Sequence, residues 1–316
     1  MNPAYCDADN SSARPVQRAA SGRAAEGLEI ARAESRIARR RALAGLLLGP
    51  VVATLGCASV NYGDDQYRLT WATAGKDVMW IPTRENVAVA MLEAAATRPD
   101  DIVYDLGSGD GVIPIVAARR FGARAVGIEY NPDLVALSQR NAVRAGVADR
   151  VTLKRGDIFV EDFSEATVVT LYLGESLNLK LEPRLRRMRP GTRIVSNTFS
   201  LGAWVPDRTL DLAENGRAFY WIVPAAVEGR WRFMGLPGRD MLVAQVGQRG
   251  QFIDLRELGS RAAPATEGRL EGSQARFILP GAAGQPLRLT GSFSGDRFVG
   301  VIDGLPGRSV TGERLR

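Results

Sequence analysis

Residues 101–129 read DIVYDLGSGDGVIPIVAARRFGARAVGIE, and this stretch decides the fold of the chain. It begins with a short apolar run, Ile102 to Leu106, which is typical of a parallel strand buried on both faces. Three glycines follow at alternate positions, and the next apolar residues recur at helical spacing as far as Gly122. A second apolar run then ends at Glu129. The order strand, glycine-rich turn, helix and strand predicts a Rossmann-like α/β sheet.

The turn and the acidic residue after the second strand indicate a nucleoside ligand. In open α/β sheets, ligands bind outside the carboxyl ends of the strands, and glycines there let a ligand approach the backbone. Glu129 follows the turn by about 20 residues and suits the two hydroxyls of a ribose. A dinucleotide-binding fingerprint needs a third glycine where this chain has Val112, so that type of site is not indicated. A phosphate-binding loop is not indicated either, because no Gly-Lys-Ser/Thr sequence follows.

Acidic residues in the turn narrow the choice of nucleoside. Asp105 and Asp110 would repel a pyrophosphate, but they tolerate a ligand with a cationic amino acid end and a sulfonium. These charges favour S-adenosylmethionine over NAD, FAD or ATP. The candidate cofactor-binding residues of this stretch are Asp105, Gly107, Ser108, Gly109, Asp110, Gly111 and Glu129.

A further acidic residue follows the predicted third strand, at residues 151–154. Asp157 lies where it can accept a hydrogen bond from the exocyclic amine of adenine, and Ile158 can pack on the adenine ring. A plain turn or helix-capping residue is the alternative explanation for Asp157. Its position relative to Asp105 and Glu129 favours the cofactor role, so both residues join the candidate site.

The motifs VYDLGSGDG, VGIE and KRGDIF resemble those of the class I, or seven-strand, S-adenosylmethionine-dependent methyltransferases. With WIPT and VVTLYL, they look in particular like the small non-SET protein-lysine methyltransferases that act on the rotor-ring subunit of ATP synthase. The resemblance covers roughly residues 79–224. It implies a seven-strand sheet, S-adenosylmethionine as cofactor and a protein lysine side chain as methyl acceptor. It also implies that the segment of Pro82 and Thr83 closes over the cofactor; a plain helix start capped by Thr83 is the alternative.

The predicted fourth strand, residues 166–173, ends where the transferable methyl lies in the resembled fold. It carries Leu-Tyr-Leu-Gly instead of the Asn-Pro-Pro-Tyr type motif of nucleic-acid adenine methylases, which argues against that group. Tyr172 is a candidate for the substrate channel, although it could equally be a packing residue. The catalytic residue stays unassigned. The chain contains no histidine, and its two cysteines, Cys6 and Cys57, precede the turn, so we expect no metal site.

The remaining sequence predicts the rest of the sheet and a second region. A basic helix at residues 178–187 contains Pro183 and so is expected to start only near Glu182. Strands at residues 210–212 and 219–223 form a hairpin at an Asn-Gly turn and complete a seven-strand sheet. The length fits two domains, a methyltransferase domain at residues 72–224 and a C-terminal antiparallel all-β region at 225–316. The second region contains short alternating runs that suggest a meander, a small sandwich or a part-barrel, at residues 231–234, 241–246, 252–255, 276–279, 287–293 and 298–302.

The amino-terminal part has a different composition. Residues 1–38 read as a disordered extension. Residues 39–58 combine three arginines, an apolar run and Cys57, which resembles a signal peptide with an imperfect lipobox. The run is short for a membrane span, which needs about 20 apolar residues, and a buried or interfacial helix is the alternative. We therefore expect a membrane-associated or exported protein, with a cytoplasmic one as the alternative because S-adenosylmethionine is made in the cytoplasm.

These observations predict an S-adenosylmethionine-dependent methyltransferase, and the resemblance to the non-SET group alone implies that it modifies a protein lysine. One alternative is a non-catalytic binding protein with a methyltransferase-like fold, membrane-anchored or exported, and another is a small-molecule methyltransferase. The net charge of +6 comes from arginines spread along the chain, without basic runs interleaved with aromatics, so no nucleic-acid partner is expected. The C-terminal region either stabilises the enzyme or docks a substrate or partner. The sequence leaves the oligomeric state open.

Overall fold

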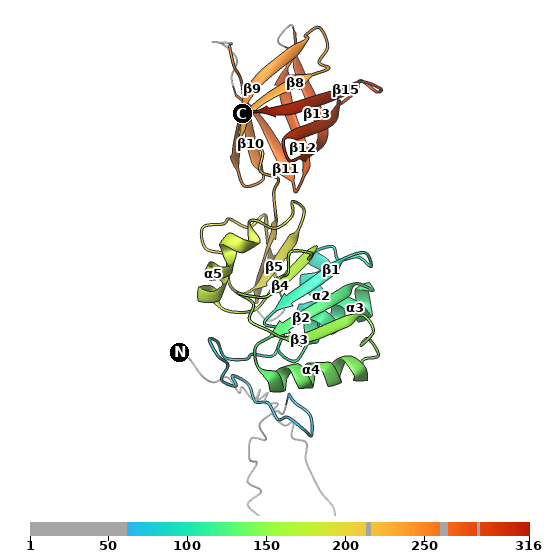
Figure 1. Ribbon diagram of the computed structural model, residues 1–316, viewed down its shortest axis with the longest axis vertical. Coiled ribbons are helices and arrows are strands. Elements are labelled where there is room, and N and C mark those ends of the chain that lie inside the picture. The colour runs from blue at the N-terminus through green and yellow to red at the C-terminus, as the bar shows by residue number, and fades with distance from the viewer. Residues whose placement is uncertain (1–61, 213–215, 260–264, 283–284) are drawn as a thin grey trace, which may run out of the picture. The chain divides into compact units, whose positions relative to one another are not determined.

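A computed structural model describes residues 62–212, 216–259, 265–282 and 285–316. It contains a seven-stranded mixed sheet and, after it in the sequence, a closed eight-stranded antiparallel barrel (Figure 1). This confirms the predicted fold class. The predictions for residues 1–38 and 39–58 lie outside the described residues. None of the helices in the described ranges is long and apolar enough to cross a membrane.

The sheet has the strand order β3-β2-β1-β4-β5-β7-β6. The first five strands run parallel, whereas β7 is antiparallel to both of its neighbours. The order reverses at β1, because the chain passes from there to β2 on one side and later to β4 on the other. Ligands of open α/β sheets bind at such a reversal. The strands are β1 (Ile102–Leu106), β2 (Arg124–Glu129), β3 (Val151–Arg155), β4 (Val168–Leu171), β5 (Arg193–Asn197), β6 (Arg208–Asp211) and β7 (Arg217–Ile222).

Helices cover both faces of the sheet because successive residues of a buried strand point to opposite sides. Val103 and Val168 pack in the core cluster that also holds residues of α2 and α3. Their neighbours Tyr104 and Val169 pack in the cluster that holds residues of α5. This explains why the central strands read as continuous apolar runs. The helices are α2 (Glu85–Ala94), α3 (Val112–Phe121), α4 (Pro132–Arg144) and α5 (Glu175–Leu185).

The prediction for the basic helix was wrong at its start. Helix α5 begins at Glu175, directly after Gly174 at φ 94°, and runs through Pro183. Proline lacks an N–H, so it removes the bond that the Leu179 carbonyl would accept within the helix. Leu179 is exposed, so water can satisfy this carbonyl. A proline on the exposed face of a helix, near its end, therefore does not force the helix to start later.

Two other local expectations differ from the structure. The hairpin of the last two sheet strands lies about two residues earlier than predicted, at β6 and β7, and most of its turn lies outside the described residues. Thr83 does not cap α2, because the N-cap position belongs to Arg84 and carries no side-chain capping bond. Thr83 is thereby left one residue outside the helix.

The barrel closes fully, whereas the sequence suggested a meander, a sandwich or a part-barrel. Its interior is filled by five aromatic side chains that are at most 3% exposed, Trp231, Phe233, Phe277, Phe293 and Phe298. The strand order is β10-β11-β12-β13-β14-β15-β8-β9. The strands are β8 (Gly229–Met234), β9 (Met241–Arg249), β10 (Phe252–Glu257), β11 (Thr266–Glu271), β12 (Gln274–Pro280), β13 (Pro286–Ser294), β14 (Arg297–Ile302) and β15 (Ser309–Leu315).

Two barrel strands, β11 and β15, have no counterpart in the sequence prediction. Both carry glycine where an alternating strand would place an apolar side chain. A Cβ on Gly268 would lie 2.5 Å from Phe277 Cβ, and one on Gly312 would lie 2.9 Å from Phe233 Cε1. The large rings take the space inside the barrel, so these inward positions must be small. Their strands consequently lack the apolar alternation that reveals a strand.

Candidate functional site

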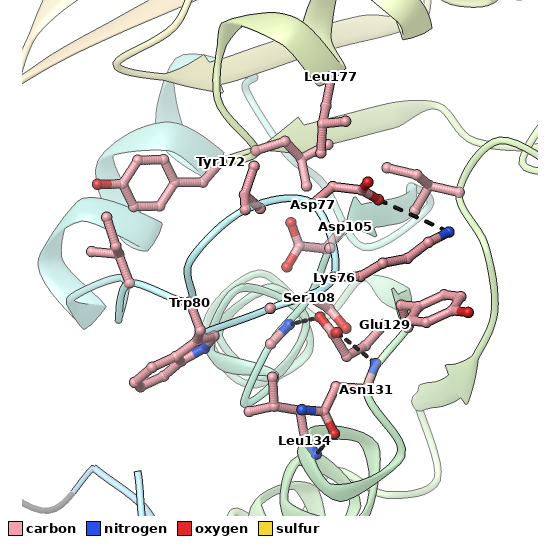
Figure 2. A pocket seen from close by; sticks show the side chains of 18 of the residues that line it. Lys76, Asp77, Trp80, Asp105, Ser108, Glu129, Asn131, Leu134, Tyr172 and Leu177 are labelled. Carbon is pink, nitrogen blue, oxygen red and sulfur yellow. Dashed lines mark hydrogen bonds and ion pairs between the residues drawn. The ribbon is translucent and has the colours of Figure 1, made fainter. Parts of the chain in front are cut away.

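A pocket of about 1060 Å³, its open mouth included, lies at the carboxyl ends of the parallel strands. Its walls come from the loops after β1, β2, β3 and β4 and from the segment at residues 73–81 (Figure 2). Most of the predicted site residues line it: Thr83, Asp105, Gly107, Ser108, Gly109, Asp110, Glu129, Asp157, Ile158 and Tyr172. Pro82 and Gly111 do not line the pocket.

The turn after β1 is held in place by the neighbouring strand. The N–H groups of Gly107 and Ser108 both donate to the Ile128 carbonyl, at 2.8 and 3.0 Å. Gly109 has φ 53°, and a Cβ there would lie 2.5 Å from Trp80 Nε1. Only a residue without a side chain fits between this indole and the turn. The bare backbone of the turn therefore forms one wall of the pocket.

Gly111 and Ser108 also pack tightly around the turn, and their predicted cofactor role stays a prediction. A Cβ on Gly111 would lie 2.9 Å from Ser138 Cβ, so this glycine allows α3 to pack closely on α4. The Ser108 hydroxyl lies against Gly127 of β2, where an added Cβ would come within 2.6 Å of it. It has no hydrogen-bond partner among the described residues. At Ser108, therefore, the side chain packs against the sheet.

Glu129 is fixed by two backbone donors. The N–H of Gly109 donates to its Oε2 at 3.0 Å, and the N–H of Asn131 donates to its Oε1 at 2.9 Å (Figure 2). Each carboxylate oxygen has a second lone pair, so both oxygens can still accept from a ligand. A carboxylate held in this orientation fits the two adjacent hydroxyls of a ribose.

Two carboxyl groups of the turn have raised pKa values. Burial raises the pKa of Asp105 to about 7, against the effect of the Thr170 hydroxyl, which donates to Oδ1 at 2.7 Å. The negative charges of Glu129 and Asp110 raise it further. Burial likewise raises the pKa of Asp110 to about 6, although backbone hydrogen bonds lower it. A bound cation would relieve this cost, because it favours the ionised carboxylates.

These pKa values predict a pH-dependent affinity for a cationic ligand. Below pH 7, Asp105 is protonated in the free protein and must lose a proton when the cation binds. We expect the dissociation constant for S-adenosylmethionine to rise by up to about tenfold between pH 7 and pH 6, and more steeply below pH 6, where Asp110 also binds a proton. Calorimetric titration at pH 6 and 8, in buffers of different ionisation enthalpy, measures both the affinity and the released proton.

The matched variant for this pH dependence is Asp105→Asn, which keeps the shape of the side chain. It should retain only the weaker dependence due to Asp110, centred near pH 6. Equal affinity of the wild-type protein at pH 6 and pH 8, with no proton released, would contradict the expected ionisation of Asp105.

Asp157 makes the turn contact that the sequence allowed, and its cofactor role stays a prediction. Its Oδ1 accepts from the Phe159 N–H at 2.9 Å, which is a turn bond, while its Oδ2 lies 3.4 Å from Lys76 Nζ. The bond from Phe159 and the ammonium of Lys76 hold its pKa below the usual range for a carboxyl group. One oxygen therefore belongs to the turn, and the other can serve a ligand.

The segment at residues 73–81 was missed as a part of the site. Thr73 and Trp80 form an isolated antiparallel bridge, in which the Trp80 N–H donates to the Thr73 carbonyl at 2.7 Å. Lys76 Nζ lies 4.3 Å from the ring centroid of Tyr130, a pocket residue that was also missed. Trp80, the single aromatic residue of this segment, was its available signal, but one residue carries no pattern.

The opposite end of the pocket is apolar. Tyr172 follows β4 and stacks on Phe199, with ring centroids 6.4 Å apart and an interplanar angle of 29°. Leu173 and Leu177 also line this end. Figure 2 shows Tyr172 and Leu177 on one side of Asp105, and Glu129 with Asn131 on the other. The pocket therefore has a polar end suited to a nucleoside and an apolar end beside Tyr172. Within the described part of the chain, no group of acidic and cysteine side chains could hold a metal ion.

The sheet order, the glycine-rich turn after β1 and the acidic residue that ends β2 define a class I S-adenosylmethionine-dependent methyltransferase, and S-adenosylmethionine is its cofactor. Residues 105–208 match the ANTKMT methyltransferase domain model. The chain is 42% identical over 139 residues to a protein-lysine N-methyltransferase of Saccharolobus islandicus. The matched region covers 43% of this chain and 86% of that protein. The chain belongs to the family of this protein-lysine N-methyltransferase.

Other relatives are similar over a smaller share of their length. The mouse adenine nucleotide translocase lysine N-methyltransferase is 40% identical over 111 residues, 34% of this chain and 48% of that protein. A human lysine N-methyltransferase named for a subunit of ATP synthase is 36% identical over 137 residues, 40% of this chain and 58% of that protein. The chain thus spans about half the length of these two. A solved RNA methyltransferase from Salinibacter ruber, in complex with S-adenosyl-L-homocysteine, is 52% identical, covers 46% of this chain and 96% of its own, and has a TM-score of 0.45.

These comparisons confirm the predicted methyltransferase activity. They do not favour the alternative of a non-catalytic binding protein. The individual site residues and the domain boundaries stay predictions.

Proposed function

We propose that the chain transfers methyl groups to the ε-amino group of lysine in a protein. The family relationship to a protein-lysine N-methyltransferase carries this proposal. Three relatives whose names include a protein acceptor, adenine nucleotide translocase or a subunit of ATP synthase, support a protein substrate.

The charge of the pocket supports a cationic acceptor. Among the described residues that line it, Lys76 is the only basic one, against five acidic residues: Asp77, Asp105, Asp110, Glu129 and Asp157. A cleft lined by one sign of charge attracts ligands of the opposite sign. It should concentrate lysine side chains at the mouth and repel acceptors that carry phosphate.

The apolar end of the pocket supports transfer to an amine. When bound, S-adenosylmethionine supplies an activated methyl group on a sulfonium. An unperturbed lysine has a pKa of about 10.4 and must lose its proton before it can accept the methyl group. Tyr172, Leu173 and Leu177 offer an environment that disfavours a charged ammonium and so lowers its pKa. This explains how a chain without histidine can use lysine as an acceptor without an imidazole base.

The proposal predicts that methyl label enters lysine. The full chain is incubated with methyl-labelled S-adenosylmethionine and a library of lysine-containing peptides, and the products are hydrolysed in acid. We expect labelled ε-N-methyllysine, and at least about tenfold less label when every lysine in the library is replaced by arginine. Glu129→Ala supplies the cofactor-site control.

Parallel reactions with RNA and with a pool of small amines distinguish the other acceptors. Label in RNA, the substrate class of the Salinibacter ruber protein, or in small amines but not in peptides would overturn the lysine proposal. Neither outcome would challenge the methyltransferase assignment itself.

The predicted localisation is a separate proposal. It depends on residues 39–58, which lie outside the described ranges. A membrane-associated or exported protein therefore stays a prediction, as does the cytoplasmic alternative.

A further inference from the structure

Lys76 contacts two pocket residues, Asp157, which is predicted to bind adenine, and Tyr130, which directly follows Glu129. Its Nζ lies 3.4 Å from Asp157 Oδ2 and 4.3 Å from the ring centroid of Tyr130. It also lies 3.9 Å from Asp77 Oδ2, and Figure 2 shows the two neighbouring side chains at the rim of the pocket. The ammonium thus lies between two carboxylates and over an aromatic face.

Adenine would need the same partners. Its exocyclic amine donates hydrogen bonds, as an ammonium does, and Asp157 is the acceptor assigned to it above. An aromatic face such as that of Tyr130 can hold either a cation or a flat base. The Phe159 N–H takes one lone pair of the other oxygen, Oδ1, while the Lys76 ammonium lies both at Oδ2 and over the Tyr130 ring, the two places that adenine would take. Lys76 and adenine therefore compete for Asp157 Oδ2.

We propose that Lys76 occupies the adenine end of the cofactor site in the free protein, and that entry of adenine displaces its ammonium from Asp157 onto Asp77. The proposal rests on the assignment of Asp157 to adenine. Lys76 is a positioning residue in this scheme, because it sets the affinity and rate of cofactor entry without taking part in methyl transfer.

The geometry makes this displacement easy. The side chains of Lys76 and Asp157 are 44% and 32% exposed, and ion pairs in such positions are weak. Lysine has a flexible stem and a compact charge that can change partners without rebuilding a fixed geometry. Asp77 is already within ion-pair distance, so the ammonium keeps a counter-charge when it leaves Asp157. The displacement of the ammonium thus has a small but measurable free-energy cost.

The experiment is a calorimetric titration of S-adenosylmethionine into the full-length wild-type protein and Lys76→Met. Methionine keeps much of the length of the stem and removes the competing ammonium. We expect Lys76→Met to bind about 3- to 10-fold more tightly, the size of a weak ion pair. The matched control is Lys154→Met, which removes the same charge from β3, where Lys154 Nζ bonds Glu161 Oε2 at 2.7 Å. This control should bind like the wild-type protein.

A double-mutant cycle tests the role of Asp77. Asp77→Asn removes the alternative counter-charge, so it should weaken cofactor binding about 2- to 3-fold when Lys76 is present. The same substitution in the Lys76→Met background should leave the affinity unchanged. The coupling between the two substitutions is the signature of a shared ammonium.

Four results would overturn the proposal. Equal binding by Lys76→Met would show that Lys76 does not affect the cofactor. Weaker binding would show that Lys76 holds the cofactor instead of competing with it. If Lys154→Met tightened binding as much as Lys76→Met, the effect would come from the loss of one positive charge and not from the position of Lys76. An equal effect of Asp77→Asn in both backgrounds would contradict the proposed movement of the Lys76 ammonium onto Asp77. Failure of the wild-type protein to bind S-adenosylmethionine would instead contradict the cofactor assignment, so the two failures are distinguishable.

Discussion

Replacement of Glu129 by alanine should weaken S-adenosylmethionine binding by about 10²- to 10³-fold. Hydrogen bonds to a charged acceptor contribute about 1.5–3 kcal/mol each, and the substitution removes the acceptor for both ribose hydroxyls. It also releases the N–H groups of Gly109 and Asn131, which the carboxylate holds at 3.0 and 2.9 Å. The turn then loses the contact that fixes its backbone beside the ligand.

Calorimetric titration of the purified full-length variants measures this loss. Glu129→Gln keeps one acceptor oxygen and should show an intermediate affinity. Glu93→Ala removes an exposed carboxylate of α2, outside the pocket, and should bind like the wild-type protein. Binding by Glu129→Ala within about threefold of wild type would contradict the ribose assignment, provided that the variant shows the circular dichroism spectrum of the folded protein.

Replacement of Asp101 by alanine should lower the free energy of unfolding of the sheet domain by about 3–5 kcal/mol. Asp101 is 3% exposed and forms a buried ion pair with Arg193. It also accepts from the Thr167 hydroxyl at 2.7 Å and from the Arg98 N–H at 2.7 Å. Without the carboxylate, the Arg193 guanidinium stays buried beside the Ala95 carbonyl with no counter-charge.

Urea unfolding tests this expectation, with hydrogen exchange of the β1 and β5 amides as a local measure of the sheet. Asp100→Ala is the matched control, because the neighbouring Asp100–Arg98 pair is 74% and 63% exposed. Exposed pairs contribute about 0–1 kcal/mol. Equal effects of the two substitutions would show that the buried pair does not stabilise the sheet. The loss should leave cofactor affinity unchanged under conditions where both variants are folded.

The parts of the site that the sequence predicted share one property. The glycine turn, Asp157 and Tyr172 each follow a strand that the sequence pattern predicted, and Glu129 ends another. Parallel strands end at the same edge of the sheet, so a correct strand assignment already brings these residues together. The fold was predictable for the same reason, because buried strands and amphipathic helices have distinct periods.

The parts that were missed depend on contacts without a local pattern. Lys76 meets Asp157 across 81 positions of sequence, and Trp80 meets Gly109 through a fit that only the folded chain reveals. Helix α5 runs through Pro183, which lies on the exposed face of an otherwise partly buried helix. In the barrel, aromatic residues on other strands occupy the space beside the inward glycines of β11 and β15. The sequences of these two strands therefore lack apolar alternation and resemble loops.

Closure of the C-terminal barrel has a consequence for how that region can meet other molecules. Each of its eight strands is hydrogen-bonded on both sides, from β8 round to β9. A sheet edge is a template on which another chain can add a strand, and a closed barrel offers no such edge. Recognition by the barrel must therefore proceed through outward side chains and the loops between strands. Substitution of the outward side chains and of the loop residues, one at a time, would therefore map what this region contacts.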